Sequence, residues 1–157
     1  AQVDDTCRRS LTPYRLTTYL HSTNDYTTAS ITSGSPVKIN LPTVAKTVNG
    51  FAYDAINQRF YLSAAGVTDR EFIISSSTSL TGSANNNVVT IEMYKNGVFE
   101  EGVSLKRKLS TGADIGAFAL VGDISLSTDD YLEIYVTVSV SGTLTFSRTA
   151  INFIEVN

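Results

Sequence analysis

The chain has 157 residues, a formal net charge of −3 and an isoelectric point near 5.0. This length fits a single domain with a sizeable hydrophobic core, and the weak negative charge gives no general attraction to nucleic acid or anionic membranes. No stretch approaches the ~20 apolar residues that a membrane-spanning helix needs, so we expect no membrane insertion. Cys7 is the only cysteine, which excludes a disulfide within the chain.

The composition favours an all-β domain. Charged residues make up 17% of the chain, below the roughly 25% of ordinary soluble domains. Serine and threonine take their place at 38 positions. Threonine suits the half-exposed surface of a sheet and serine suits turns, so we expect strands joined by turns throughout.

Residues 1–24 differ from the rest of the chain. Asp4-Asp5 and Arg8-Arg9 crowd charge into a short segment, and no alternating apolar pattern persists there. Neither a heptad nor a Gly-x-y repeat is present, which excludes a coiled-coil or collagen-like stalk. We interpret this segment as an N-terminal arm that docks onto a larger partner, with a flexible terminus as the alternative. Residues 25–157 are then the folded domain.

After this arm, short alternating runs bounded by turn residues predict strands. The first begins at Ile31 and resumes after Gly34-Ser35-Pro36 as 37–41, whose apolar residues share one face. Pro42 ends it because proline cannot donate to a central ladder. The runs 51–55 and 60–64 alternate in the same way. The continuous apolar run 72–74 indicates a central strand that is buried on both faces.

The second half of the chain repeats this pattern. Runs 89–94 and 98–106 flank Asn96-Gly97, which tolerates positive φ at both central turn positions and therefore predicts a hairpin. The run 118–126 alternates next. Turn signals recur about every ten residues and no helical period is present, which is typical of an antiparallel β-sandwich or barrel. Roughly eight to ten strands in this length suit a jelly roll.

The clearest strand is 130–140. Its even positions from Leu132 to Val140 are all aliphatic, so one face belongs to a core. Its odd positions include Tyr131 and Tyr135, which make the other face partly aromatic rather than simply solvent-like. We interpret this second face as a surface with a role of its own.

Several motifs follow one another in an order that is typical of one family of β-sandwiches. They are Asn49-Gly50-Phe51-Ala52-Tyr53-Asp54, Arg59-Phe60-Tyr61-Leu62, Gly66, Phe72-Ile73-Ile74-Ser75-Ser76-Ser77, Val89-Thr90-Ile91-Glu92-Met93-Tyr94-Lys95-Asn96-Gly97 and Leu126-Ser127-Thr128-Asp129-Asp130-Tyr131-Leu132-Glu133-Ile134. This order resembles the TNF/C1q-like jelly roll over roughly residues 27–157. Asp129 stands where that family usually has glycine, so the backbone of this turn can differ.

The resemblance implies a compact homotrimer in which one face of each sandwich packs around a threefold axis, often through aromatic residues. The candidate interface residues are then Tyr53, Tyr61, Tyr131 and Tyr135, because tyrosine offers a large apolar area and a polar tip. The alternative is that these tyrosines cap sandwich edges or decorate the surface.

The composition narrows the resemblance further. A serine- and threonine-rich, cysteine-poor chain is most similar to the TNF/C1q-like domains that bacteriophages and large viruses carry in fibres, head decorations and receptor-binding tips. This similarity implies a virion surface protein, a trimeric head-decoration or short-fibre component whose arm docks to a capsid or tail protein. The alternative is a soluble C1q/TNF-like ligand or lectin that binds a receptor or glycan without belonging to a particle.

No catalytic arrangement is evident, so we expect a non-enzymatic protein without a cofactor. His21 is the only histidine and lies in the arm, and with Cys7 it cannot complete a zinc site within one chain. Asp129-Asp130 offers oxygen ligands for calcium, but aspartate is also common in turns. Glu100-Glu101 are adjacent on a strand and point to opposite faces, so they cannot flank a sugar as a glycosidase pair.

Two loops, 78–87 and 110–116, are the expected distal binding surface, because binding residues commonly sit on loops of a rigid scaffold. Asn85 and Asn86 in the first loop, and the basic run Lys106-Arg107-Lys108 before the second, are candidate contacts to a host-surface glycan or protein. The alternative for the basic run is a solvated strand end. The sequence has no phosphate-binding glycine loop and no interleaved basic and aromatic residues, so we expect no nucleic-acid binding.

Overall fold

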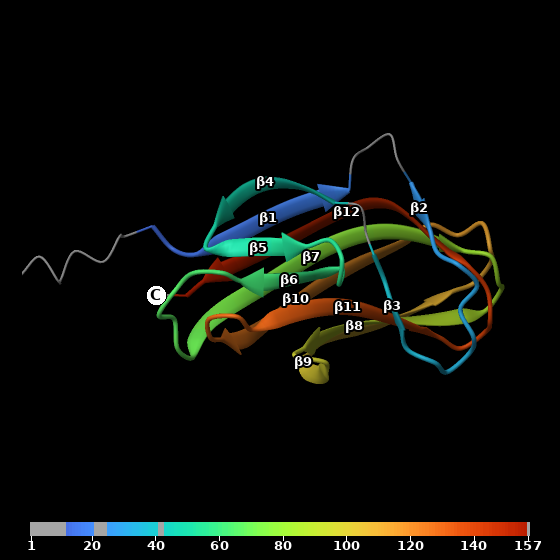
Figure 1. Cartoon of the computed structure of the whole chain (residues 1–157). Helices are drawn as coiled ribbons and strands as arrows, with labels where there is room; N and C mark the ends of the chain where they lie inside the picture. The colour runs from blue at the N-terminus through green and yellow to red at the C-terminus, as the bar shows by residue number, and fades with distance from the viewer. Residues whose placement is uncertain (1–11, 21–24, 41–42, 157) are drawn as a thin grey trace, which may run out of the picture.

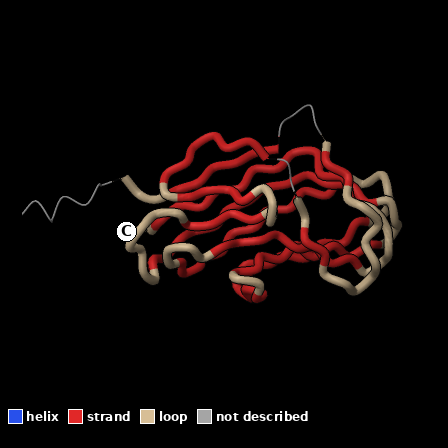
Figure 2. The backbone as a smooth tube through the Cα atoms, viewed as in Figure 1, coloured by secondary structure: helices blue, strands red, loops and turns tan. Residues whose placement is uncertain are grey.

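The computed structural model describes residues 12–20, 25–40 and 43–156 of the chain (Figure 1). All regular structure in these residues is β-strand, arranged as two antiparallel sheets. Figure 2 shows the strands running through the body of the molecule while the loops gather at its ends. The expectation of an all-β antiparallel sandwich is confirmed.

The first sheet, called sheet I below, has five strands on its main path. In spatial order they are β10 (Gly116–Leu126), β7 (Arg70–Gly82), β12 (Leu144–Glu155), β1 (Arg15–Leu20) and β4 (Thr43–Asn49), and the short β2 (Tyr26–Thr27) pairs with β12. The long strands β7, β10 and β12 alternate between buried apolar residues and more exposed ones. Sheet I therefore has one core face and one outer face.

The second sheet, called sheet II, has the same number of strands on its main path. Their spatial order is β5 (Phe51–Asp54), β6 (Arg59–Leu62), β11 (Tyr131–Val138), β8 (Asn87–Lys95) and β9 (Val98–Leu109), and the short β3 (Val37–Lys38) pairs with β11. Successive strands β9 to β12 lie alternately in the two sheets. The chain thus crosses repeatedly between the layers, as a jelly roll requires.

An aromatic cluster joins the two sheets at the core. Phe51 of sheet II stacks on Phe153 of sheet I at a centroid distance of 5.6 Å, and it meets Phe72 edge-on at 5.4 Å. Phe60 also contacts Phe153, at 5.7 Å. Such aromatic pairs add roughly 0.5–1.5 kcal/mol beyond the area that they bury. The cluster therefore fixes the short strands β5 and β6 firmly against sheet I.

The turn between β8 and β9 confirms the prediction from Asn96-Gly97. Both residues have positive φ, 51° and 79°, as a tight hairpin with the twist of its strands requires. The Asn96 side chain also ties this turn to the start of β11, because its Oδ1 accepts a hydrogen bond from the Tyr131 N–H at 3.0 Å.

Part of the expected N-terminal arm belongs to the sandwich. Residues 15–20 form β1, which pairs with β12 on one side and β4 on the other. The alternation was hidden because Leu16 and Thr18, the buried positions, include only one apolar residue. Strand β4 follows Pro42 and was not predicted. Residues 1–11 and 21–24 lie outside the described residues, so the docking role of the arm stays a prediction.

Two predicted faces differ from the structure. The run 72–74 is not buried on both sides, because Ile73 is 44% exposed between the fully buried Phe72 and Ile74. Val37 and Ile39 do not share one buried face either, since Val37 is exposed while Ile39 is in the core. Strand β3 is only a short edge strand, so no long ladder enforces alternation there.

Candidate functional site

The outer face of β11 carries two of the tyrosines predicted as interface residues. Both Tyr131 and Tyr135 are partly buried by their own chain. The Tyr135 ring lies 4.1 Å from that of Tyr94 on β8, which in turn lies 5.8 Å from Phe99 on β9. Burial, with Glu92 nearby, raises the pKa of Tyr94. An aromatic row therefore crosses three strands of sheet II.

An ion pair covers the middle of this face. Glu133 on β11 is 7% exposed, and its Oε1 lies 2.9 Å from the Nζ of Lys38 on β3. The same Nζ donates to the backbone carbonyl of Asn57 at 2.9 Å. A nearly buried carboxylate depends on such a partner, because an unpaired charge there is costly. The pair holds the β3 edge and the turn between β5 and β6 against β11.

The turn between β5 and β6 is built around Asp54. Its carboxylate accepts hydrogen bonds from the Asn57 Nδ2 at 2.7 Å, the Asn57 N–H at 3.0 Å and the Ile56 N–H at 3.1 Å. The two bonds from Asn57, of which the side-chain bond is the stronger, hold the pKa of Asp54 below its ordinary value. The turn therefore presents an ionised carboxylate to its surroundings.

Arg59 connects this turn to β11. Its Nε lies 3.3 Å from the Asp54 Oδ2. This distance makes an ion pair, but the Nε–H does not point at the carboxylate well enough to form a hydrogen bond. The guanidinium carbon sits 4.2 Å above the centre of the Tyr131 ring, a cation–π arrangement.

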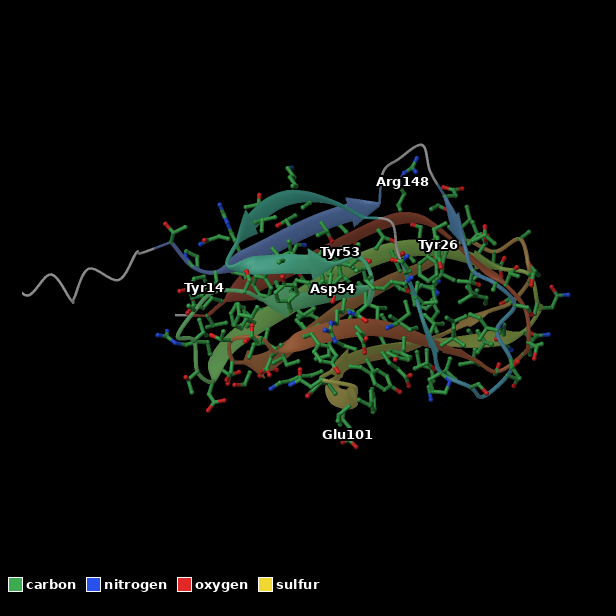
Figure 3. The ribbon with its side chains drawn as sticks, viewed as in Figure 1. Tyr14, Tyr26, Tyr53, Asp54, Glu101 and Arg148 are labelled. Carbon is green, nitrogen blue, oxygen red and sulfur yellow. The ribbon has the colours of Figure 1, made fainter. Side chains whose placement is uncertain are left out.

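An open groove of about 620 Å³ runs beside this turn. The residues that line it include Tyr53, Tyr61, Tyr131, Asp54, Asp129 and Arg59. Three of the four predicted tyrosines therefore meet in one groove, while Tyr135 does not line it. In Figure 3, Tyr53 and Asp54 lie together at the end of β5, and Glu101 projects from β9 far from them.

Tyr53 does not share the outer face of sheet II with the other tyrosines. It alternates in step with Phe51, and its ring contacts Phe60 at 5.0 Å. Its hydroxyl donates to the Asn40 Oδ1 at 2.7 Å, and burial, assisted by Asp54, raises its pKa. Tyr61 pairs directly with Tyr131 across β6 and β11. The four tyrosines do not form a single face, and their role in an interface stays a prediction.

Asp129 and Asp130 have different surroundings. Burial alone would raise the pKa of Asp130, but hydrogen bonds from Asn96 and Ser127 together with the nearby Lys95 lower it. Asp129 has a φ of 70° and is exposed beside the groove. Within the described ranges, no group of three or more His, Cys, Asp or Glu side chains is placed to hold a metal ion.

The structure brings the two predicted distal loops together. Asn85 Oδ1 accepts a hydrogen bond from the Gly112 N–H at 2.8 Å, and the Asn86 N–H donates to the Ser110 carbonyl at 3.0 Å. Asn87, which the sequence did not single out, is completely buried beside them. Its Oδ1 accepts from the backbone N–H groups of Ser139 and Val140.

The basic run does not form one patch. Lys106 and Lys108 are exposed and pair with Thr90 and Val88 on the outer face of sheet II. Arg107 alternates away from them and donates to the Ala117 carbonyl at 2.7 Å, which ties β9 to β10. The binding role of these loops stays a prediction. Cys7 and His21 lie outside the described residues.

The outer face of sheet I is a surface that the sequence reading missed. One row across it consists of small or uncharged residues, and a second row pairs two isoleucines with flanking charges. The first row is Val121, Ser75, Asn152, Thr17 and Thr47, and the second is Asp123, Ile73, Ile154, Arg15 and Asn49. Val121, Ile73 and Ile154 are 70%, 44% and 45% exposed. The signal for this face in the sequence was the run of small, uncharged residues at alternate positions of 117–121.

Membrane-spanning helices are also absent from the described part of the chain, where no helix is long and apolar enough.

Comparison with known proteins identifies the fold but not a sequence family. No family model matches the sequence, and no curated protein matches it. Among solved structures, the TNF Eiger from S. frugiperda superposes with a TM-score of 0.60 over 93% of this chain and 94% of that chain, at 6% sequence identity. The chain therefore has a TNF-like jelly-roll fold, as the motif order predicted.

Proposed function

We propose that this chain is a non-enzymatic assembly protein that forms a homotrimer through the outer face of sheet I. The observation that carries the proposal is the contrast between the two outer faces. Sheet II covers the middle of its outer face with the Tyr135–Tyr94 ring contact and the Glu133–Lys38 ion pair. Sheet I instead leaves Val121 exposed next to Ser75, and it leaves Ile73 and Ile154 exposed next to each other between Asp123 and Arg15.

The residues of this face suit close packing against another copy. Small side chains let two sheets approach, and three exposed aliphatic side chains supply apolar area that association removes from water. The row through Ile73 and Ile154 also has Asp123 at one end and Arg15 toward the other. Opposite charges toward opposite edges favour a head-to-tail contact between neighbours, which closes into a ring when the rotation fits.

We further propose that the trimer is a virion surface component, a head decoration or short fibre that docks through the N-terminal residues. The serine- and threonine-rich, cysteine-poor composition and the motif resemblance support this role. A soluble ligand is the second candidate, and the fold similarity to the TNF Eiger favours it.

Sedimentation of the full chain tests the assembly. The unmodified protein is expected at three times its chain mass of 17.0 kDa. Ile73→Asp is expected to dissociate it, because the variant places a charge in a contact that excludes water. Ile115→Asp is the matched control, since Ile115 is equally apolar and 70% exposed but lies in a loop. It should stay trimeric.

Two outcomes contradict the proposed face. A monomeric unmodified chain rules out the homotrimer altogether. Dissociation by Tyr135→Asp while Ile73→Asp leaves the mass unchanged moves the interface to sheet II. Electron cryo-microscopy of virus particles from the same source then separates the two roles, since only a virion component is present as threefold groups on their surface.

A further inference from the structure

We propose that the groove beside the β5–β6 turn binds a neutral saccharide. The groove combines the rings of Tyr53, Tyr61 and Tyr131 with a guanidinium group and two carboxylates. Its volume of about 620 Å³ falls within the roughly 300–1,000 Å³ of small-molecule sites. A pyranose has an apolar C–H face that packs on aromatic rings and a rim of hydroxyl groups that need donors and acceptors.

The polar groups of the groove are available for such a rim. Within the described residues, the hydroxyl groups of Tyr61 and Tyr131 and the Asp129 carboxylate form no hydrogen bond or ion pair. A hydroxyl can donate or accept, whereas a carboxylate only accepts. The groove therefore offers both kinds of partner to a hydroxyl-rich ligand.

Arg59 is oriented before a ligand arrives. Its guanidinium group stacks on Tyr131 and pairs with Asp54, which the turn holds in place. A planar guanidinium fixed in this way loses little freedom when it donates to a ligand. Because Arg59 and Asp54 cancel each other's charge, only the charge of Asp129 remains. That residual charge disfavours an anionic ligand. The hydroxyl groups of Tyr61 and Tyr131 and the Asp129 carboxylate suit the hydroxyl groups of a neutral saccharide.

The groove is independent of the proposed subunit contact. Its residues belong to β5, β6 and β11 of sheet II, to the β5–β6 turn and to the turn before β11, whereas the proposed trimer face lies on sheet I. The experiments can therefore contradict the saccharide site and still confirm the trimer, and the reverse also holds. The site also differs from the predicted distal loops, 78–87 and 110–116, and from the basic run 106–108.

Saturation-transfer NMR on the full chain tests the inference. The probes are glucose, galactose, mannose and N-acetylglucosamine, with N-acetylneuraminic acid and choline as charged comparisons. We expect saturation transfer to at least one neutral sugar and weaker or absent transfer to the charged probes. Titration should then show about tenfold weaker binding by Asp129→Asn, because a neutral amide oxygen replaces a charged hydrogen-bond acceptor.

The matched control is Asp69→Asn. Both aspartates are exposed and have positive φ, 44° at Asp69 and 70° at Asp129, and asparagine tolerates that backbone region. Asp69 does not line the groove, so this variant should bind like the unmodified chain. Tyr131→Phe, which keeps the ring under Arg59 and removes the hydroxyl, should weaken binding less than Asp129→Asn.

Three results would overturn the inference. The first is the absence of transfer to every neutral sugar. The second is a response to choline or N-acetylneuraminic acid that exceeds the response to all neutral sugars. The third is sugar binding that survives Asp129→Asn unchanged and is lost in an Asn85→Ala, Lys106→Ala double variant, which would place the site at the distal loops.

Discussion

Asn87 joins the start of β8 to the end of β11, and its removal should lower stability measurably. The residue is completely buried. Its Oδ1 accepts from the Ser139 N–H and the Val140 N–H, each at 3.1 Å. Asn87→Ala leaves both donors without this partner, although the Ser139 N–H keeps its hydrogen bond to the Val88 carbonyl at 3.0 Å. Each such hydrogen bond is worth about 1 kcal/mol net, and the Ser139 N–H keeps a second partner, so the loss should be about 1–2 kcal/mol.

Thermal unfolding monitored by circular dichroism checks this value. For a domain of this size, 1 kcal/mol shifts Tm by roughly 2–4 °C, so a loss of about 1–2 kcal/mol gives a fall of about 2–8 °C. Protein concentration must stay fixed, because association itself raises Tm. Asn85→Ala is the control, since that exposed neighbour makes a single bond to Gly112 and should cost less. An Asn87→Ala shift no larger than that of the control would refute the reasoning.

Two further predictions concern backbone conformation and acid. Gly50 has a φ of 78°, and a Cβ there would lie 2.5 Å from the Tyr14 ring, whereas Gly34 has a φ of 76° and open space for a Cβ. Gly50→Ala should therefore lower the free energy of unfolding by about 1 kcal/mol more than Gly34→Ala. Equal urea midpoints for the two variants would contradict this. The lowered pKa of Asp130 means that its stabilisation is present above the ordinary value of 3.8 and is lost as the pH falls through the folded-state value. The stability difference between the unmodified chain and Asp130→Asn should therefore shrink in urea titrations below pH 3.8, and a difference that does not change with pH would contradict the assignment.

Local patterns predicted the elements whose periodicity is strong. The stretch 130–140 contains β11 because its aliphatic residues alternate without interruption, and Asn96-Gly97 forms its hairpin because few other residues accept positive φ twice. Strand β1 was missed because a buried threonine interrupts its apolar face. Periodicity reports which residues share a face but not whether other residues cover that face. It could not show, therefore, that the face carrying Ile73 is exposed.

The groove could be predicted only in part. The sequence indicated Tyr53, Tyr61 and Tyr131 as candidate interface residues. Their meeting with Asp54 and Arg59 depends on β6 pairing with β11, a contact between segments far apart in the chain. No local pattern encodes that pairing. The same limit hid the outer face of sheet I, since its rows combine residues from five strands.

The two sheets divide the surface of this molecule into two kinds of face. Sheet II carries side chains that contact one another, such as the Glu133–Lys38 pair, and leaves a groove whose Tyr61 and Tyr131 hydroxyl groups have no hydrogen-bond partner among the described residues. Sheet I carries small side chains and exposed aliphatic ones. An open face of small and aliphatic side chains suits a large partner of matching shape, whereas a polar groove suits a small hydroxylated one. Because each face belongs to a different layer, Ile73→Asp should abolish assembly without changing sugar binding. Asp129→Asn should weaken sugar binding without changing assembly.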